Sequence, residues 1–278
     1  MNARIRPVGD LLREWRQRRH LSQLALAIEA DISAKHVSFL ESGRAAPSRE
    51  MILRIAERLD VPLRDRNLLL LAAGYAPLFP QRSLEDPALE NARRAIDLVL
   101  RGHEPYPALA VDRHWTLVTS NRAVAPLLAG IDPALQKPPV NVLRLSLHPA
   151  GLAPRIANLA EWRAHLLARL AQQIHVTADP ELVRLLEELR GYPAPDGAKA
   201  APASADHADV VVPLKLRTAS GVLSLISTTT IFGTPVDVTL SELAIESFFP
   251  ADTATAEALR RMAAQSTSAQ PAAAMSPS

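Results

Sequence analysis

The sequence predicts two folded domains of different class, an all-α domain of five short helices followed by an α+β domain. Apolar residues recur at helical spacing through the first 75 residues, and capping residues precede several of the runs. The segment VVVPLKLRTASGVLSLISTTTIFG, in the second half of the chain, is rich in β-branched residues. The chain has 278 residues, which is enough for two domains that each bury a core.

The composition excludes several kinds of site. There is no cysteine, which rules out disulfides, thiolate metal sites and cysteine catalysis, and which suits a reducing cytoplasm. No run approaches the roughly 18 apolar residues of a membrane span, and the N-terminus lacks the apolar segment of a signal peptide. We therefore expect a cytoplasmic protein with no membrane partner.

Positive charge is concentrated at the N-terminal end. Residues 1–75 hold 13 Lys/Arg and 9 Asp/Glu, a balance of +4. The totals of 31 and 29 leave 18 and 20 for the remainder, a balance of −2. A module that binds a polyanion needs such an excess, although a basic helix face is more often simply solvated.

A helix-turn-helix is predicted between Ser22 and Gly43. Ser22 and Ser33 each precede an apolar helical run and can cap its first amides. Asp31 occupies the turn, where a left-handed backbone is common, and Gly43 ends the second helix. The second helix keeps a polar outward face, as DNA-reading helices do.

The segment LSQLALAIEADISAKHVSFLESGRAAPSREMILRIAERLDVP resembles the XRE-type, phage-repressor-like helix-turn-helix. The matching residues are Ser22-Gln23, Ala27, Ile32-Ser33, Glu41, Gly43 and Pro47-Ser48. Asp31 departs from the family pattern, which most often has glycine there, and we expect the turn to survive. The resemblance implies that residues 1–78 form a DNA-binding domain whose partner is a double-stranded operator. A homodimer is expected, because one short recognition helix reads few base pairs.

The resemblance also implies which side chains contact DNA. Ser33–Ser42 would lie in the major groove, where Lys35 and His36 can bond to base edges. Phe39 would meet either a thymine methyl or a neighbouring helix or dimer mate, and both alternatives stay open. Arg44 would contact phosphate, with a solvated surface arginine as the alternative. The full predicted set is Ser22, Gln23, Ser33, Ala34, Lys35, His36, Ser38, Phe39, Arg44 and Arg49.

The rest of the chain mixes predicted helices and strands. Residues 79–104 form a linker and connecting helix, 105–262 an α+β domain and 263–278 a disordered tail. Predicted helices are Glu90–Arg101, 121–128, about 155–174 and about 180–190. Predicted strands are Ala108–Val111, Trp115–Thr119 and Val142–Leu147, with a hairpin turn at Ser220-Gly221 and an exposed loop from Asp196 to Asp209.

This half also resembles a known domain. NVLRLSLHPAGLAPRIANLAEW and FGTPVDVTLSELAIESFFPADTATAEALR are similar to the ligand-binding domain of MmyB-like regulators. Those proteins join an XRE-type helix-turn-helix to a PAS-like domain reported to hold a fatty-acyl ligand. The likeness extends from about Gly9 to Arg261 and implies a PAS-like domain at 105–262, with a small fatty-acyl ligand and no other cofactor. Composition and periodicity alone show only an α+β domain.

PAS-like domains enclose a small apolar cavity with a few polar anchors. Candidate anchors for a ligand carboxylate are His148, Arg155 and Asn158, which Trp162 could shield. The alternative is that Arg155 and Asn158 cap a helix and tie loops together. Candidate walls are Leu117, Leu166, Leu170, Leu223, Leu225 and Ile231.

Enzyme chemistry has little support. The chain lacks GxxxxGK[ST], HExxH, GxSxG and GxGxxG. His148, His165 and His175 lack the spacing of paired helical metal ligands. We therefore expect a regulator that is not an enzyme and has no metal site. Two alternatives remain: a second domain that serves only dimerisation or protein interaction, and a catalytic domain fused to a DNA anchor.

Overall fold

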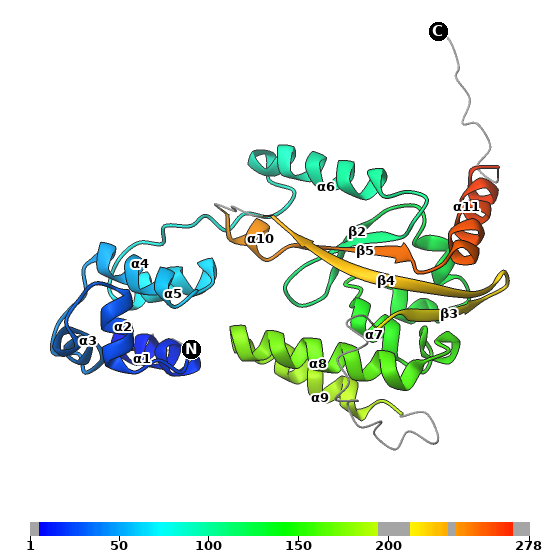
Figure 1. Cartoon of the computed structure of the whole chain (residues 1–278). Coiled ribbons are helices and arrows are strands. Elements are labelled where there is room, and N and C mark those ends of the chain that lie inside the picture. Colours follow the sequence, from blue (N-terminus) through cyan, green and yellow to red (C-terminus); the bar gives the residue numbers. More distant parts are fainter. Residues whose placement is uncertain (1–5, 194–211, 233–236, 269–278) are drawn as a thin grey trace, which may run out of the picture. The chain divides into compact units, whose positions relative to one another are not determined.

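The computed structural model describes residues 6–193, 212–232 and 237–268 (Figure 1). The chain divides into two compact units, with the main boundary between Asp86 and Pro87. Among the described residues, 175–177 and 237–241 also group with the first unit. The boundaries that the sequence places at residues 78 and 104 stay predictions.

Five helices form the N-terminal unit, as the sequence predicts. They are α1 (Val8–Arg18), α2 (Gln23–Glu29), α3 (Ala34–Glu41), α4 (Arg49–Arg58) and α5 (Leu63–Ala72). The Ser22 hydroxyl accepts from the Ala25 amide at 3.0 Å, and the Ser33 hydroxyl accepts from the His36 amide at 3.1 Å. Each cap pairs an amide that the helix leaves without a partner, which stabilises a helix by about 1 kcal/mol.

The turn between α2 and α3 has the predicted backbone. Asp31 has φ +52°, and Gly43, just after α3, has φ +71°. Aspartate tolerates the left-handed region better than most residues with a Cβ, so the turn forms without glycine.

Helix α1 lies against the C-terminal end of α3 at backbone distance. A Cβ on Gly9 would lie 2.4 Å from the Leu40 carbonyl oxygen and 2.8 Å from that of Glu41. Only a residue without a side chain fits there. Beneath this contact, the buried side chains of Leu12, Trp15 and Leu40 belong to the core of the unit.

A buried carboxylate joins the first three helices. The Glu41 side chain is 1% exposed, and its oxygens accept from Arg16 Nε at 2.6 Å and Gln23 Nε2 at 2.9 Å. Arg13 Nη2 donates to the Glu41 carbonyl oxygen at 2.9 Å. Burial alone would raise the pKa of Glu41, but the hydrogen bonds from Arg16 and Gln23 and the Arg16 charge hold this pKa below its usual value. Ionised Glu41 therefore stabilises the fold at neutral pH, and this contribution is lost as pH falls through the folded-state pKa.

The C-terminal unit contains an antiparallel sheet of five strands in the order β2-β1-β5-β4-β3. The strands are β1 (Ala108–Val111), β2 (Leu117–Ser120), β3 (Leu214–Thr218), β4 (Gly221–Ile231) and β5 (Ala244–Pro250). Strand β1 has its predicted bounds. A hairpin turn forms one residue earlier than predicted, because Thr218 pairs with Gly221, whose φ is +110°, and leaves Ala219 and Ser220 as the turn residues. The second strand begins two residues later than predicted, because Trp115 has φ +66° and belongs to the preceding turn.

The described residues beyond α5 contain six further α-helices. They are α6 (Glu90–Gly102), α7 (Val142–Leu147), α8 (Leu159–Thr177), α9 (Pro180–Gly191), α10 (Val238–Ser241) and α11 (Thr253–Ser268). In Figure 1, α7, α8 and α9 lie on one side of the sheet and α6 on the other. The core of this unit is formed mainly by α8, α9, β3 and β4.

The strand predicted at Val142–Leu147 is wrong, because this segment is helix α7. The Asn141 side chain accepts from the amides of Leu143 and Arg144, both at 3.1 Å, which caps a helix start. Leu143, Leu145 and Leu147 are all buried. A short helix that is buried on several sides can therefore show the alternation of apolar residues that is typical of a strand.

Three other predicted segments differ from the structure in their bounds or helix type. The helix predicted at 121–128 is only a 3-10 turn, Ala125–Leu128, and the one predicted from about 155 begins at Leu159. Residues 263–268, predicted as tail, belong to α11. The predicted loop at Asp196–Asp209 and the rest of the tail lie outside the described residues.

Replacement of Glu41 by alanine should destabilise the N-terminal unit by about 3–5 kcal/mol, because Arg16 would lose the partner of its buried charge. The matched control is Glu14→Ala, which breaks the partly exposed pair with Arg18 and should cost below about 1 kcal/mol. Native-state hydrogen exchange of α1–α3 amides in the full chain measures both. Equal effects of the two variants would contradict the role given to Glu41.

Candidate DNA interface and apolar cavity

Helix α3 presents its polar side outward. Val37, Leu40 and Glu41 are buried, whereas Lys35 is exposed and Ser38 is partly exposed. The helix therefore has one face fixed in the core and one face available to a partner.

Phe39 lies on the outward side between two cations. Lys35 Nζ is 5.5 Å from the centre of the Phe39 ring, and Arg44 Cζ is 5.9 Å from it. Cations at this distance are attracted to the face of the ring. Phe39 is partly buried. Its two cationic neighbours, Lys35 and Arg44, belong to the same unit, and the sequence did not suggest these contacts. The two predicted partners of Phe39, a thymine methyl and a neighbouring helix or dimer mate, stay predictions.

The other predicted contacts surround α3. Ser22 and Ser33 are exposed, and each hydroxyl accepts from an amide and keeps its own proton to donate. Gln23 is held by its bond to Glu41, which orients the start of α2. Arg44 is exposed in the segment after α3, and Arg49 is the first residue of α4.

The arginine run of α1 contributes less to the surface than the sequence suggests. Arg13 and Arg16 bond to Glu41, and Arg18 pairs with Glu14. Arg19 donates to the carbonyl oxygens of Leu59 and Asp60. All four arginines bond within the unit, so this basic run has a structural role that its charge alone does not show.

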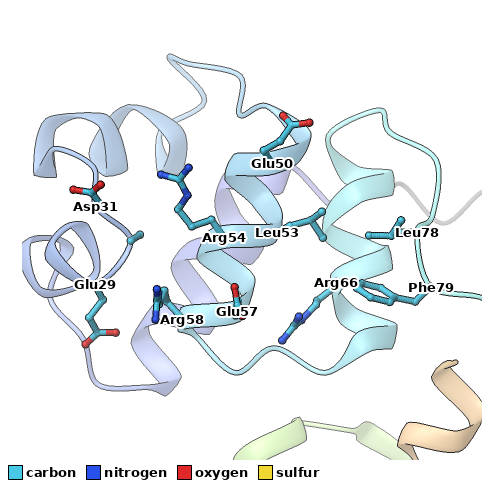
Figure 2. A pocket seen from close by; sticks show the side chains of 11 residues that line it. Glu29, Asp31, Glu50, Leu53, Arg54, Glu57, Arg58, Arg66, Leu78 and Phe79 are labelled. Carbon is cyan, nitrogen blue, oxygen red and sulfur yellow. The ribbon is translucent and has the colours of Figure 1, made fainter. Parts of the chain in front are cut away.

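A hollow of about 690 Å³ lies elsewhere on the N-terminal unit (Figure 2). It is lined by the end of α2, by α4 and α5, and by Leu78 and Phe79. Its charged side chains are Glu29, Asp31, Glu50, Glu57, Arg54, Arg58 and Arg66. None of the predicted DNA contacts lines this hollow, and its acidic majority disfavours phosphate.

The C-terminal unit holds a narrow apolar cavity of about 100 Å³ between the sheet and helices α7 and α8. Leu117, Leu166 and Leu225 line it as the sequence predicts, and Trp162 lines it too. Leu170 and Leu223 are instead buried in the core behind it, and Ile231 is 69% exposed at the end of β4. The polar residues of the lining are Ser146, Arg169, Ser227 and Glu246.

Arg169 is the feature of this cavity that the sequence analysis missed. Its guanidinium donates to both carboxylate oxygens of Glu246, at 3.0 and 2.5 Å, and lies 4.6 Å from the centre of the Trp115 ring. Trp162, Leu166 and Arg169 follow one another at i, i+4 and i+7 along α8, so they share a helix face. An arginine within a buried apolar stripe was the signal available in the sequence.

The predicted carboxylate anchors lie elsewhere. Arg155 Nη1 donates to the carbonyl oxygens of Leu127 and Ala129, at 2.9 and 3.0 Å. Asn158 accepts from the Lys215 amide at 3.0 Å and donates to the Pro213 carbonyl at 2.8 Å.

His148 also has a local partner, because its Nδ1 accepts from the Ala150 amide at 3.0 Å. None of the three predicted anchors is among the residues that line the cavity. Their geometry fits the alternative in which they tie loops together, and a role as ligand anchors has no support from their positions.

No helix in the described ranges is long and apolar enough to cross a membrane. No group of three or more His, Asp or Glu side chains there could hold a metal ion.

Arg155→Ala should lower the stability of the C-terminal unit by about 1–3 kcal/mol, because the carbonyl groups of Leu127 and Ala129 lose a charged donor. The control is Arg184→Ala, which removes an exposed arginine paired with Glu181 and should have little effect. Urea unfolding with hydrogen exchange at residues 125–131 measures the difference. An Arg155→Ala protein as stable as the wild type would show that these bonds do not hold the loops.

Comparison with known proteins places both units in one family. Residues 92–262 match the MmyB-like transcription regulator ligand binding domain, and residues 12–65 match a helix-turn-helix domain. An uncharacterized HTH-type transcriptional regulator, RghRB of Bacillus subtilis (strain 168), is 34% identical over 106 residues, or 36% of this chain and 73% of the relative.

Two further matches cover less or are weaker. A putative HTH-type transcriptional regulatory protein of Methanoculleus marisnigri is 31% identical over 118 residues, or 41% of this chain and 38% of that protein. The structure of an RNA-binding light-oxygen-voltage receptor matches with 12% identity and a TM-score of 0.24, over 95% of this chain and 65% of that one. A similarity this low supports no conclusion. The family match covers more than half of the sequence, and the chain therefore belongs to the MmyB-like transcription regulators, with a helix-turn-helix DNA-binding domain and a ligand-binding domain.

Proposed function

We propose that an amphipathic ligand with an acyl chain occupies the cavity of the C-terminal unit and thereby changes the affinity of the helix-turn-helix for its operator. The observation that carries this proposal is the lining of the cavity. Most of its residues are apolar, and its few polar groups include the Arg169–Glu246 pair. Such a lining fits a ligand with a long apolar part and one polar end.

The size of the cavity determines what ligand binding would have to change. Ligand pockets usually have volumes of about 300–1,000 Å³. This cavity, of about 100 Å³, is smaller than that, so an acyl chain would have to widen it on binding. A ligand that binds the widened state better than the narrow one shifts the population toward it. By linkage, any DNA affinity that differs between the two states then changes with ligand concentration.

The DNA-reading surface is proposed to be the outward side of α3 with its flanking residues. Lys35, His36 and Ser38 would reach base edges from the major groove, with the first turn of α3 nearest the bases. Ser22, Gln23, Arg44 and Arg49 would contact phosphates. The exposure of Lys35 and Arg44 supports this assignment, as does the fixed orientation that Glu41 gives to α3.

A homodimer is proposed because α3 has only eight residues. One such helix contacts few base pairs, and two copies related by a two-fold axis read a palindromic site with half-sites about 34–36 Å apart. Light scattering with and without an operator duplex tests this state.

The ligand proposal is tested by native mass spectrometry of the full chain, which should show an acyl compound retained from the host. Leu166→Phe adds volume to the cavity lining and should remove that ligand. Ala168→Phe places the same side chain on an exposed position of α8 and should retain it. Circular dichroism checks that both variants fold. A wild-type protein with no ligand that also ignores added acyl compounds in thermal melts would end the proposal.

Lys35→Ala should cost about 1–3 kcal/mol of operator affinity and relax the preference at one base pair. Arg44→Ala should weaken all sequences alike and reduce the salt slope by about 1, because it removes a phosphate contact. Arg58→Ala, in the acid-rich hollow, is the control and should change neither. Titrations of a base-substituted operator at several salt concentrations measure these effects. Unchanged base discrimination in Lys35→Ala would remove this residue from the reading surface.

A further inference from the structure

Arg169 and Glu246 form a closed polar cluster at the cavity. The two side chains are 28% and 5% exposed. Thr229 completes the cluster: its hydroxyl accepts from Arg169 Nη2 at 2.5 Å and donates to Glu246 at 2.9 Å. The carboxylate of Glu246 thus has three donors, and the guanidinium is stacked on Trp115. Helix α8 and strands β4 and β5 each supply a member of the cluster.

The charges of this cluster cancel. Among the described residues that line the cavity, Arg169 is the cation and Glu246 is the anion. A ligand carboxylate would bring a second negative charge beside the same guanidinium. It would either leave one anion without a full partner in an apolar space or displace the nearly buried Glu246 from its donors. Both outcomes are costly, because an unpaired buried charge loses its hydration without compensation.

The nearby histidine does not supply the missing positive charge. His165 lies on α8, with its ring 5.5 Å from that of Trp162, and it is not part of the lining. Burial, followed by the positive charge of Arg169, lowers the pKa of His165 below its usual value. The imidazole is therefore neutral at neutral pH.

The cavity does offer donors to an uncharged acceptor. A guanidinium has five N–H groups, and the three bonds described above leave two of them. The Ser146 hydroxyl accepts from Trp162 Nε1 at 3.0 Å and keeps its own proton to donate. The Ser227 hydroxyl is a further group of the lining. A carbonyl or hydroxyl oxygen can bond to these donors without adding charge.

We infer that the cavity takes an acyl-chain ligand whose polar end is uncharged, such as an alcohol, ester or amide, and that the Arg169–Glu246 pair excludes the corresponding free carboxylate. This inference rests on the proposed ligand-sensing function and adds the chemistry of the head group. Glu246 is then a specificity-determining residue, because its carboxylate already pairs with the Arg169 guanidinium that a ligand carboxylate would need.

The test compares three probes of equal chain length: decan-1-ol, decanamide and decanoate. Binding to the full-length protein at neutral pH is followed by isothermal titration and by the change in tryptophan fluorescence, to which Trp115, stacked on Arg169, contributes together with Trp15 and Trp162. The wild type should bind the alcohol and the amide at least about tenfold more tightly than decanoate. Glu246→Gln keeps the size of the side chain but releases the charge of Arg169, so its affinity for decanoate should rise by about tenfold or more.

Glu188→Gln is the matched control, because it neutralises a carboxylate paired with an arginine, Arg144, on the surface of the same unit. It should leave the order of the probes unchanged. Decanoate bound by the wild type as tightly as the neutral probes would overturn the inference and leave ligand sensing intact. If the wild type binds none of the three and retains no acyl compound, both the sensing function and the inference fail. If Glu246→Gln does not fold, the order of the wild-type affinities for the three probes still tests the inference.

Discussion

The N-terminal unit depends on one buried carboxylate. Glu41, the last residue of α3, receives bonds from Arg16 on α1 and Gln23 on α2, so a single ion fixes three helices. A buried pair of this kind adds little net stability, since desolvation offsets much of its attraction, but it is costly to break on one side. Its effect here is geometric. The helix proposed to enter the major groove has its C-terminal end tied to the two preceding helices, and the backbone contact at Gly9 allows little adjustment.

The C-terminal unit uses the same chemistry for another purpose. Arg169 and Glu246 join α8 to the sheet as Arg16 and Glu41 join α1 to α3. The difference lies in their surroundings: the Glu41 carboxylate is held by side chains of two other helices, whereas Glu246 borders the apolar cavity. A charged pair beside empty space restricts what can enter that space. Similar pairs can therefore be structural in one unit and selective in the other.

Local signals in the sequence predicted the first unit well. Serine before an apolar run, an acceptable residue at a left-handed turn and a terminal glycine depend on neighbouring residues only, and Ser22, Asp31 and Gly43 behave as expected. Features that depend on contacts between distant residues were predicted less well. The alternating leucines of α7 predict a strand, because the local sequence does not show that distant elements bury this short helix on several sides. Arg155 looked like a ligand anchor because a sequence does not show which carbonyl groups surround a guanidinium. The partner of Arg169 lies 77 residues away, so only the fold brings them together.

The cancellation of charge in the cavity affects how the two units respond to their surroundings. Proteins that bind nucleic acid through phosphate contacts lose affinity steeply as ionic strength rises, because counterions compete for the polymer. A neutral site presents no comparable field for dissolved ions to screen. The affinity of the DNA-free protein for its ligand would then vary little with salinity, while its affinity for the operator would fall as salinity rises. In a cell under osmotic stress, a rise in salt concentration would therefore weaken operator binding more than ligand binding.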